Sequence, residues 1–381
     1  MNSSKRITNL DFIRGCALLG ILVINVISFG LPITALFNHS TFGRGNLLDW
    51  VVIVISSVFF EYKMMGLFSM LFGVGLMIFI DNAKQKFKKP KLLSFWRNFL
   101  LLLFGVIHIS IWEGDILIIY ALCAFCIILF SQIQNNKITI FLITLLVFID
   151  LLFINYIDSL YDASGNLILE EAWVVAASEG GSLNFGKFWF PEEPNWGNIS
   201  GLLLVLDASN RAMTLMVVGI LLYRLNIIQG TKGIDFYKKL MFYGFSIGLP
   251  FSIYSIYLLI SSEYSAAIAI TSRLWLTLSV IPMVLGYVGL LTIMNIKLRK
   301  SITTKLRACG KMAFTNYITQ TLIGVVVLRG LFEIGTFSRS QLIMYVFAVW
   351  ALQIYWSKPI IDKFKYGPLE WLLRKLTYYF V

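Results

Sequence analysis

The chain has 381 residues, of which 58% are hydrophobic and 14% are charged. In a soluble globular protein about a quarter of the residues are charged. The lower fraction here argues against an ordinary soluble enzyme and indicates an integral membrane protein. The formal net charge of +12 does not predict nucleic-acid binding, because the basic residues gather in the gaps between apolar segments.

Apolar runs of about 20 residues, the length with which a helix crosses a bilayer, recur along the whole chain. They are continuous and lack the alternating pattern of membrane β-strands. We therefore predict an all-α, polytopic membrane protein with a single domain over residues 1–381. About ten transmembrane helices are expected, at 16–37, 50–80, 93–112, 115–133, 137–157, 199–225, 236–261, 268–296, 310–332 and 340–361. The second contains Lys63 and is expected to tilt or break there.

The gaps between these spans differ in charge from one side to the other. The basic gaps 81–92, 224–239 and 297–309 fall on the same side as the N-terminus and the tail of about 362–381. Because cytoplasmic loops are rich in Lys and Arg, we predict that both termini are cytoplasmic. The acidic segment of about 158–198 is then an outer loop, either a lid over an outward-facing site or a solvated connection.

The first candidate site lies in the predicted outer turn between the third and fourth spans. His108, Glu113 and Asp115 follow one another closely there. Ionisable residues at a bilayer edge are energetically costly, so their presence indicates a functional site. Histidine can take or give a proton, and either carboxylate could hold its tautomer. The structural alternative is that Asp115 caps the fourth helix while His108 binds a carbonyl. His39, after the first span, is expected on the same side, either in this site or as a bystander.

Two further groups of polar residues belong to predicted spans. Asp11 and Arg14, at the cytoplasmic start of the first, form either an interfacial anchor or, with Arg97, a site for phosphate groups. Lys63, Arg211 and Arg329 need partners or a water-filled cavity, and Glu61 is a possible partner for Lys63. Asn316 and Gln320 share a helical face and either join helices or line a cavity. The cysteines and the two histidines show no zinc-ligand spacing.

Several longer motifs follow one another along nearly the whole chain. They are Leu10-Asp-Phe-Ile-Arg-Gly15, Leu71-Phe-Gly-Val-Gly75, Gly105 to His108 with Trp112-Glu-Gly-Asp115, Gly310-Lys-Met-Ala-Phe-Thr-Asn-Tyr317 and Gly367-Pro-Leu-Glu-Trp371. Together they resemble the YeiB-like family, the domain of unknown function 418. That family is similar, more distantly, to the transmembrane acyltransferase superfamily, which includes O-acetyltransferases of cell-envelope glycans.

The resemblance implies a helical core of about ten spans and acyl transfer from cytoplasmic acyl-CoA to an acceptor across the membrane. The stretch around His39 is also similar to the segment that carries the catalytic histidine in a lysosomal relative, which implies a role for His39. We therefore expect a multi-pass protein of the bacterial plasma membrane. Its partners would be the lipid bilayer, acyl-CoA as co-substrate and an envelope acceptor, with no tightly bound cofactor, no metal and no nucleic acid.

In this hypothesis His108, alone or with His39, is the general base, and Asp115 or Glu113 orients it. Arg14 and Arg97 hold the donor phosphates. The alternative is a permease for a small polar or anionic solute, with Lys63, Arg211, Asn316 and Gln320 along its path. A membrane sensor or assembly factor is a third possibility.

Overall fold

The computed structural model describes residues 6–36, 38–39, 42–130, 133–158, 196–264 and 266–379. Every regular element in this part of the chain is helical, which confirms the predicted all-α class. The acidic segment 158–198 lies for the most part outside the described residues. In chain order the elements are α1 (Thr8–Gly30), η1 (Ile33–Leu36), α2 (Leu47–Phe59), α3 (Lys63–Lys84), α4 (Pro90–Ile109), α5 (Leu117–Phe130), α6 (Asn136–Asp158), α9 (Trp196–Arg224), α10 (Ile234–Ser261), α11 (Ala266–Lys297), α12 (Lys300–Lys311), α13 (Ala313–Gly324), the π-turn η2 (Val325–Arg329), α14 (Arg339–Phe364) and α15 (Pro368–Thr377).

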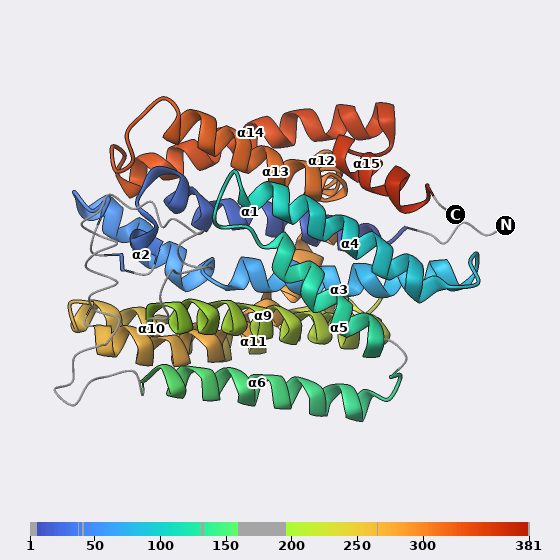
Figure 1. The fold of residues 1–381 in the computed structure, drawn as a ribbon, viewed down its shortest axis with the longest axis horizontal. Coiled ribbons are helices and arrows are strands. Elements are labelled where there is room, and N and C mark those ends of the chain that lie inside the picture. Colours follow the sequence, from blue (N-terminus) through green and yellow to red (C-terminus); the bar gives the residue numbers. More distant parts are fainter. Residues whose placement is uncertain are drawn as a thin grey trace.

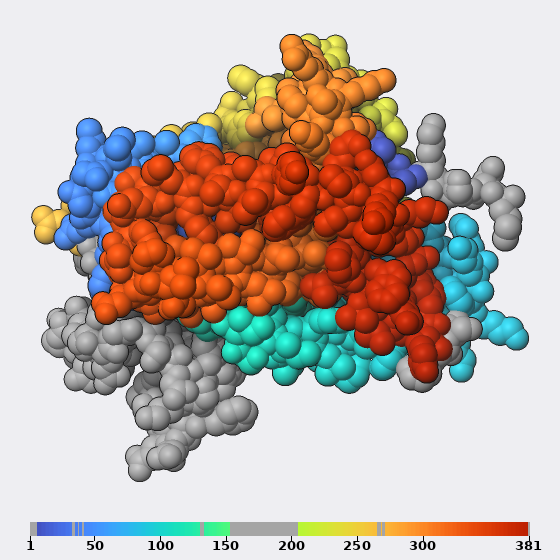
Figure 2. Space-filling model, turned by 90° about the horizontal axis from the view of Figure 1, so that it is seen from above, coloured from blue at the N-terminus to red at the C-terminus, as the bar shows by residue number. Residues whose placement is uncertain are grey.

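The long helices lie side by side along the longest axis of the molecule (Figure 1). α12, α13 and α14 form one layer, α1, α3 and α4 lie next to it, and α9, α10, α11 and then α6 follow on the other side (Figure 1). Seen from above, α13 and α14 form a continuous face with α15 at one end (Figure 2). α1 begins and α15 ends at this same end of the bundle, as the predicted placement of both termini on one side requires (Figure 1).

Six helical stretches of the described chain are long and apolar enough to cross a membrane, namely Thr8–Gly30, Leu47–Lys84 (α2 and α3 together), Pro90–Ile109, Val205–Arg224, Ile234–Ser261 and Thr271–Lys297. All ten ranges predicted to span also contain helix, although the number of spans stays a prediction. Large apolar side chains such as Phe141, Phe242, Met344 and Tyr355 are exposed on the outside of the bundle. An apolar surface this extensive fits contact with lipid better than contact with water.

The first predicted span, 16–37, is wrong at both ends, because α1 begins at Thr8 and ends at Gly30. Its end is explained by Pro32, which disfavours helical backbone at the residue before it. Leu31 is accordingly extended, with φ −125° and ψ 161°. The helix therefore stops, and a short 3-10 turn leads to His39.

The second predicted span is broken, as its length and Lys63 indicated. α2 ends at Phe59 and α3 begins at Lys63, so the interruption falls beside the lysine. Tyr62, at the interruption, has a left-handed φ of 58°, which is unfavourable for a residue with a side chain. This break sends Glu61, Tyr62 and Lys63 towards different polar partners, which are described below.

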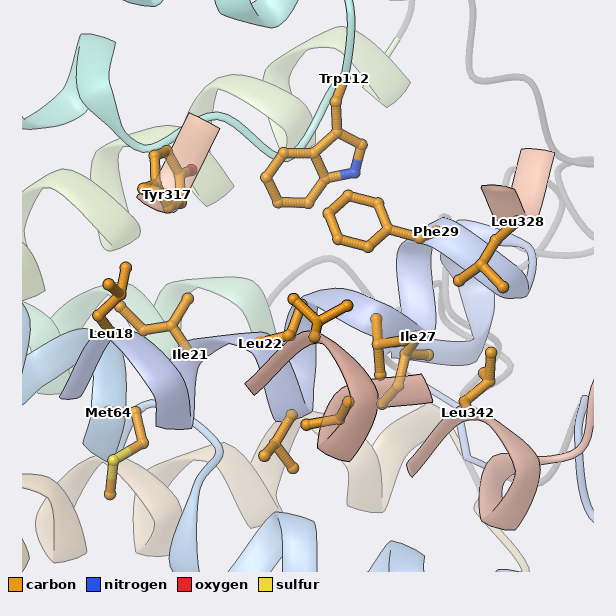
Figure 3. Packing of buried hydrophobic residues seen from close by; sticks show 14 of the residues in the cluster. Leu18, Ile21, Leu22, Ile27, Phe29, Met64, Trp112, Tyr317, Leu328 and Leu342 are labelled. Atoms are coloured by element: carbon orange, nitrogen blue, oxygen red, sulfur yellow. The ribbon is translucent and has the colours of Figure 1, made fainter. Parts of the chain in front are cut away.

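α1 is the central helix of the core and packs closely on α12. Leu18, Leu22 and Phe29 on α1 are fully buried, and Phe29 lies beside Trp112 (Figure 3). The close approach to α12 depends on glycine: a Cβ on Gly310 would lie 1.9 Å from the carbonyl oxygen of Asp11. Small residues let helix backbones approach in this way in membrane proteins.

We expect Gly310→Ala to lower the stability of the protein by roughly 1–3 kcal/mol, because the added methyl group meets backbone that cannot yield cheaply. Gly233→Ala is the matched control, since nothing lies within 4 Å of a Cβ at that position. Unfolding of the two purified variants in detergent would show the difference. Equal midpoints for both variants would contradict the prediction.

Candidate functional site

His108 and Asp115 form a buried pair where α4 meets α5. His108 lies in the last turn of α4, and its Nδ1 is 2.6 Å from Oδ1 of Asp115. The other oxygen of Asp115, Oδ2, accepts a hydrogen bond of 3.0 Å from the backbone N–H of Ile118 at the start of α5. The capping role and the orienting role of Asp115 therefore coexist. One oxygen of the Asp115 carboxylate caps the start of α5, and the other orients the imidazole of His108.

The second ring nitrogen of His108, Nε2, is available for proton transfer. Both side chains of the pair are almost wholly buried, at 2% exposed for His108 and 0% for Asp115. Nε2 of His108 is buried and has no hydrogen-bond partner within the described chain. The rings of Trp112 and Tyr317 lie against the imidazole, with centroid distances of 5.9 and 5.2 Å. A carboxylate on Nδ1 favours proton exchange at Nε2, which is the arrangement a general base needs.

Glu113, the other predicted orienting carboxylate, contacts a different residue. It accepts hydrogen bonds of 2.6 and 3.1 Å from Arg329 at the end of η2. Arg329 also donates to the carbonyl oxygen of Ser28, and Trp112 donates to the hydroxyl of Ser28. The two interactions attach the α4–α5 turn to the end of α1 and so hold His108 in place. Of the two carboxylates, the structure thus brings only Asp115 to His108.

A cavity of about 200 Å³ lies between α1, α3, α4, α5, α12, α13 and α15. One part of its wall is basic and contains Arg14, Arg97 and Lys311. Much of the remaining wall is apolar, and Tyr317 also belongs to it. His108 does not line the cavity, but Tyr317 does, and its ring also lies beside the imidazole of His108. Tyr317 is therefore a neighbour of both the cavity, which holds Arg14 and Arg97, and His108.

The basic part of the wall is only partly neutralised. Asp11 lies 3.7 Å from Arg14, although Arg6 binds the same carboxylate at 2.6 Å. Arg97 lies over the ring of Phe79, 4.8 Å from its centroid. Within the described residues, neither Arg97 nor Lys311 has a carboxylate within 4.0 Å.

Among the described residues of the cavity wall, the carboxylate is that of Glu370, and it has a structural role. Glu370, from α15, accepts hydrogen bonds from the backbone N–H groups of Phe314 and Thr315 at 2.7 and 3.1 Å, and from the Thr315 hydroxyl. It therefore caps α13, where a negative charge is favourable. The net charge of the wall favours an anion.

His39 lies in a different cluster from His108. Its Nε2 is 4.0 Å from Glu61, and its ring meets the edge of Tyr264 at 5.7 Å between centroids. Burial lowers the pKa of His39 to about 4, so the ring is neutral at pH 7. The described partners of the two histidines do not overlap, so the structure does not bring them together as a pair.

The buried cations inside the bundle have partners that the sequence only partly indicated. Lys63 donates to the carbonyl oxygen of Ser57 at 2.8 Å and to the hydroxyl of Ser252 at 2.7 Å, and not to Glu61 as expected. Arg211 pairs with Asp207, and its guanidinium lies over the ring of Tyr62 at 4.0 Å. The spacing of four residues between Asp207 and Arg211 could have predicted that pair.

Asn316 and Gln320 join helices. Gln320 donates to Gln353 of α14 at 2.9 Å, and Gln353 donates to the carbonyl oxygen of Asn316 at 2.8 Å. Asn316 donates to Ser357 at 3.0 Å. Neither Asn316 nor Gln320 lines the cavity, so the structure favours the first of the two predicted roles. Tyr317, Lys311 and Glu370 lie in motifs that the sequence singled out, but only the structure shows that they line the cavity.

Fold and site together define an all-helical bundle of the membrane-protein type, with a buried histidine–aspartate pair beside a cavity that is basic on one side. The family model described as "Protein of unknown function (DUF418)" matches residues 222–380. The predicted resemblance to the YeiB-like family is confirmed.

Relatives extend this match over nearly the full length. The chain is 28% identical to the "Uncharacterized protein YeiB" of Escherichia coli (strain K12), over 98% of this chain and 96% of that one. It is 27% identical to the "Uncharacterized protein YxaH" of Bacillus subtilis (strain 168), over 99% and 95%. A third similar protein is an uncharacterized 39.9 kDa protein of Bacillus acidopullulyticus, 25% identical over 98% and 94%.

Proposed function

We propose that the protein is a membrane-bound acyltransferase in which His108 is the general base. The observation that carries this proposal is the cavity, which extends from Arg14, Arg97 and Lys311 to the Tyr317 ring that contacts His108. A donor with anionic groups at one end and an apolar acyl group at the other matches such a wall. Acyl-CoA has this chemistry, since its phosphates are carried at one end of a long chain that ends in the thioester.

The cavity is smaller than a whole acyl-CoA, so it would take the chain and the acyl group while the nucleotide stays outside it. The three cations would bind the phosphates, with each arginine able to bind two oxygens at once. The thioester would then lie near Tyr317. Displacement of the Tyr317 ring would expose the thioester to Nε2 of His108.

In the reaction, Nε2 of His108 takes the proton of an acceptor hydroxyl or amine as the acceptor attacks the thioester carbonyl. The tetrahedral intermediate breaks its carbon–sulfur bond, and the imidazolium returns the proton to the departing CoA thiolate. Asp115 holds the ring and stabilises its protonated form through Nδ1.

We infer that the protein crosses the bacterial plasma membrane several times with both termini in the cytoplasm. The support is the excess of Lys and Arg in alternate gaps between spans, together with relatives that come from bacteria. The donor would enter from the cytoplasm, and the acceptor, a glycan, a lipid or a small molecule, would bind at the outer face.

Binding of acetyl-CoA to the purified protein tests the donor site. We expect Arg14→Gln and Arg97→Gln each to raise the dissociation constant about tenfold or more, because each removes charged hydrogen bonds to phosphate. Arg374→Gln is the control, since Arg374 is exposed on α15, outside the cavity wall. The proposal fails if the wild-type protein shows no saturable binding in calorimetry, or if the control weakens binding equally.

The second candidate function is a permease for a small polar or anionic solute, and the break between α2 and α3 favours it. Broken helices with a charged residue at the interruption often form solute sites in transporters. Lys63 begins α3 at such a break and is fully buried. Uptake of solute into proteoliposomes without any acyl donor would support this function over acyl transfer.

A further inference from the structure

Four polar side chains from separate segments meet at the end of the bundle away from the start of α1. We call them the Arg339 cluster: His39 from the loop after α1, Glu61 from the α2–α3 break, Tyr264 from the α10–α11 turn and Arg339 from the first position of α14. His39 contacts both Glu61 and Tyr264, at the distances given above. Arg339 interacts electrostatically with Tyr264, with Glu61 and with Asp49 of α2. None of these residues lines the cavity beside His108.

The guanidinium of Arg339 is buried but incompletely bonded. Arg339 is only 2% exposed. Nη2 donates to the carbonyl oxygen of Ala35 at 2.8 Å and Nε donates to that of Phe42 at 3.3 Å. Nη1 has no partner in the described chain, and no described carboxylate lies within 4.0 Å of the group. A buried N–H donor without an acceptor is costly, and no carboxylate is bonded to this one, so the geometry favours an anionic oxygen at Nη1.

Two more buried polar atoms of the same cluster lack described partners, namely the Tyr264 hydroxyl and Nδ1 of His39. Tyr264 is 7% exposed and has a left-handed φ of 63°, and Glu263 before it has 54°. Such backbone is unfavourable for residues with side chains and persists where the surroundings impose it. Buried polar groups are nearly always hydrogen-bonded, so three unpaired atoms within one cluster call for a partner from outside the described chain.

We propose that the Arg339 cluster binds an oxyanion that carries a hydroxyl group, such as a phosphate or a hydroxy acid. Nη1 of Arg339 and the hydroxyl of Tyr264 donate to the anionic oxygens. Neutral His39 turns its Nε2–H towards Glu61, which leaves Nδ1 to accept a hydrogen bond from the ligand hydroxyl. The two carbonyl groups that hold Arg339 orient it before the ligand arrives, which lowers the cost of binding.

This site stands apart from the proposed acyl transfer, because it uses neither His108 nor the cavity. It can therefore be tested on the purified full-length chain without any acyl donor. The probes are inorganic phosphate and glycolate, each compared with chloride at equal ionic strength. Calorimetry gives the dissociation constant, and the unfolding temperature gives an independent measure of binding, since a ligand of the folded state raises it.

We expect saturable binding of at least one probe to the wild-type protein. Tyr264→Phe keeps the ring and removes one donor, and should weaken binding about tenfold. Arg339→Gln should abolish binding, although it also removes bonds that hold two loop carbonyl groups, so Tyr264→Phe is the decisive variant. Arg44→Gln is the control: Arg44 is exposed and acts on Tyr264 electrostatically, and its loss should change binding by no more than about threefold.

Reconstitution separates two sources of the same chemistry. If phosphatidylglycerol in nanodiscs suppresses phosphate binding while phosphatidylcholine does not, the natural ligand is a lipid headgroup. Equal binding in both assigns the site to a free anion. The proposal is overturned if neither probe binds the wild-type protein, which would mean that water alone fills the cluster, or if Tyr264→Phe binds as tightly as the wild type.

Discussion

Replacing His108 with alanine is expected to lower acyl transfer by about 10²–10⁴-fold, the usual contribution of a general base. Binding of acetyl-CoA should stay close to that of the wild type, because His108 does not line the cavity that is proposed to hold the donor. The measurement is the transfer rate at saturating acetyl-CoA, together with the dissociation constant from calorimetry. A fall in rate at constant affinity places His108 in the chemical step.

Asp115→Asn is expected to lower the rate as well, because an amide beside Nδ1 no longer stabilises the imidazolium that forms during transfer. Its oxygen can still accept the hydrogen bond that starts α5, so the fold should persist. Ser110→Ala is the matched control, since Ser110 is exposed in the same turn and its hydroxyl bonds only the nearby carbonyl of Ile107 in the described chain. Wild-type transfer by the His108 variant would disprove the assignment.

Replacing Asp207 with alanine should have the largest effect on stability. Asp207 and Arg211 are 4% exposed each, and loss of one member leaves the other charge buried without its partner. Breaking such a pair costs roughly 3–5 kcal/mol. Reversible unfolding of the purified protein in detergent and denaturant would measure the change.

The control for this prediction is Asp235→Ala. Asp235 pairs with Lys238 one helical turn further on, but both side chains are largely exposed, so stability should hardly change. Removing Asp207 and Arg211 together should cost less than the sum of the single substitutions, because neither member of the pair is then left without the other. If Asp207→Ala and Asp235→Ala unfold at the same midpoint, the buried pair does not stabilise the fold.

Local spacing was enough to predict the His108–Asp115 contact and some features of the helices. His108 and Asp115 lie in one short turn, so a contact between them depends on few backbone angles. The break at Lys63 was foreseeable because a buried lysine in an apolar run needs a special environment. In the same way, Pro32 explains the end of α1, although the predicted span ignored it.

Contacts between distant segments could not be predicted. Glu113 was as plausible a partner for His108 as Asp115, and only the position of η2 beside this turn gives Glu113 to Arg329. Lys63 was paired with Glu61 by proximity in sequence, whereas it binds Ser252 of α10. Nothing in a single sequence specifies which of many helices lies next to another, because similar apolar faces can pack in many ways.

The sequence by itself determined the class of protein, the all-α fold, the family resemblance and the residues that carry charge or a titratable group in an apolar setting. These properties depend on composition, on the length of apolar runs and on short-range spacing. Tertiary structure alone decided that Arg14, Arg97 and Tyr317 share one cavity wall, that His39 and His108 belong to separate clusters, and that Asn316 and Gln320 join helices. The reason is physical: a cavity or cluster arises where faces of several helices meet, and glycine contacts such as that of Gly310 with α1 set how closely they meet.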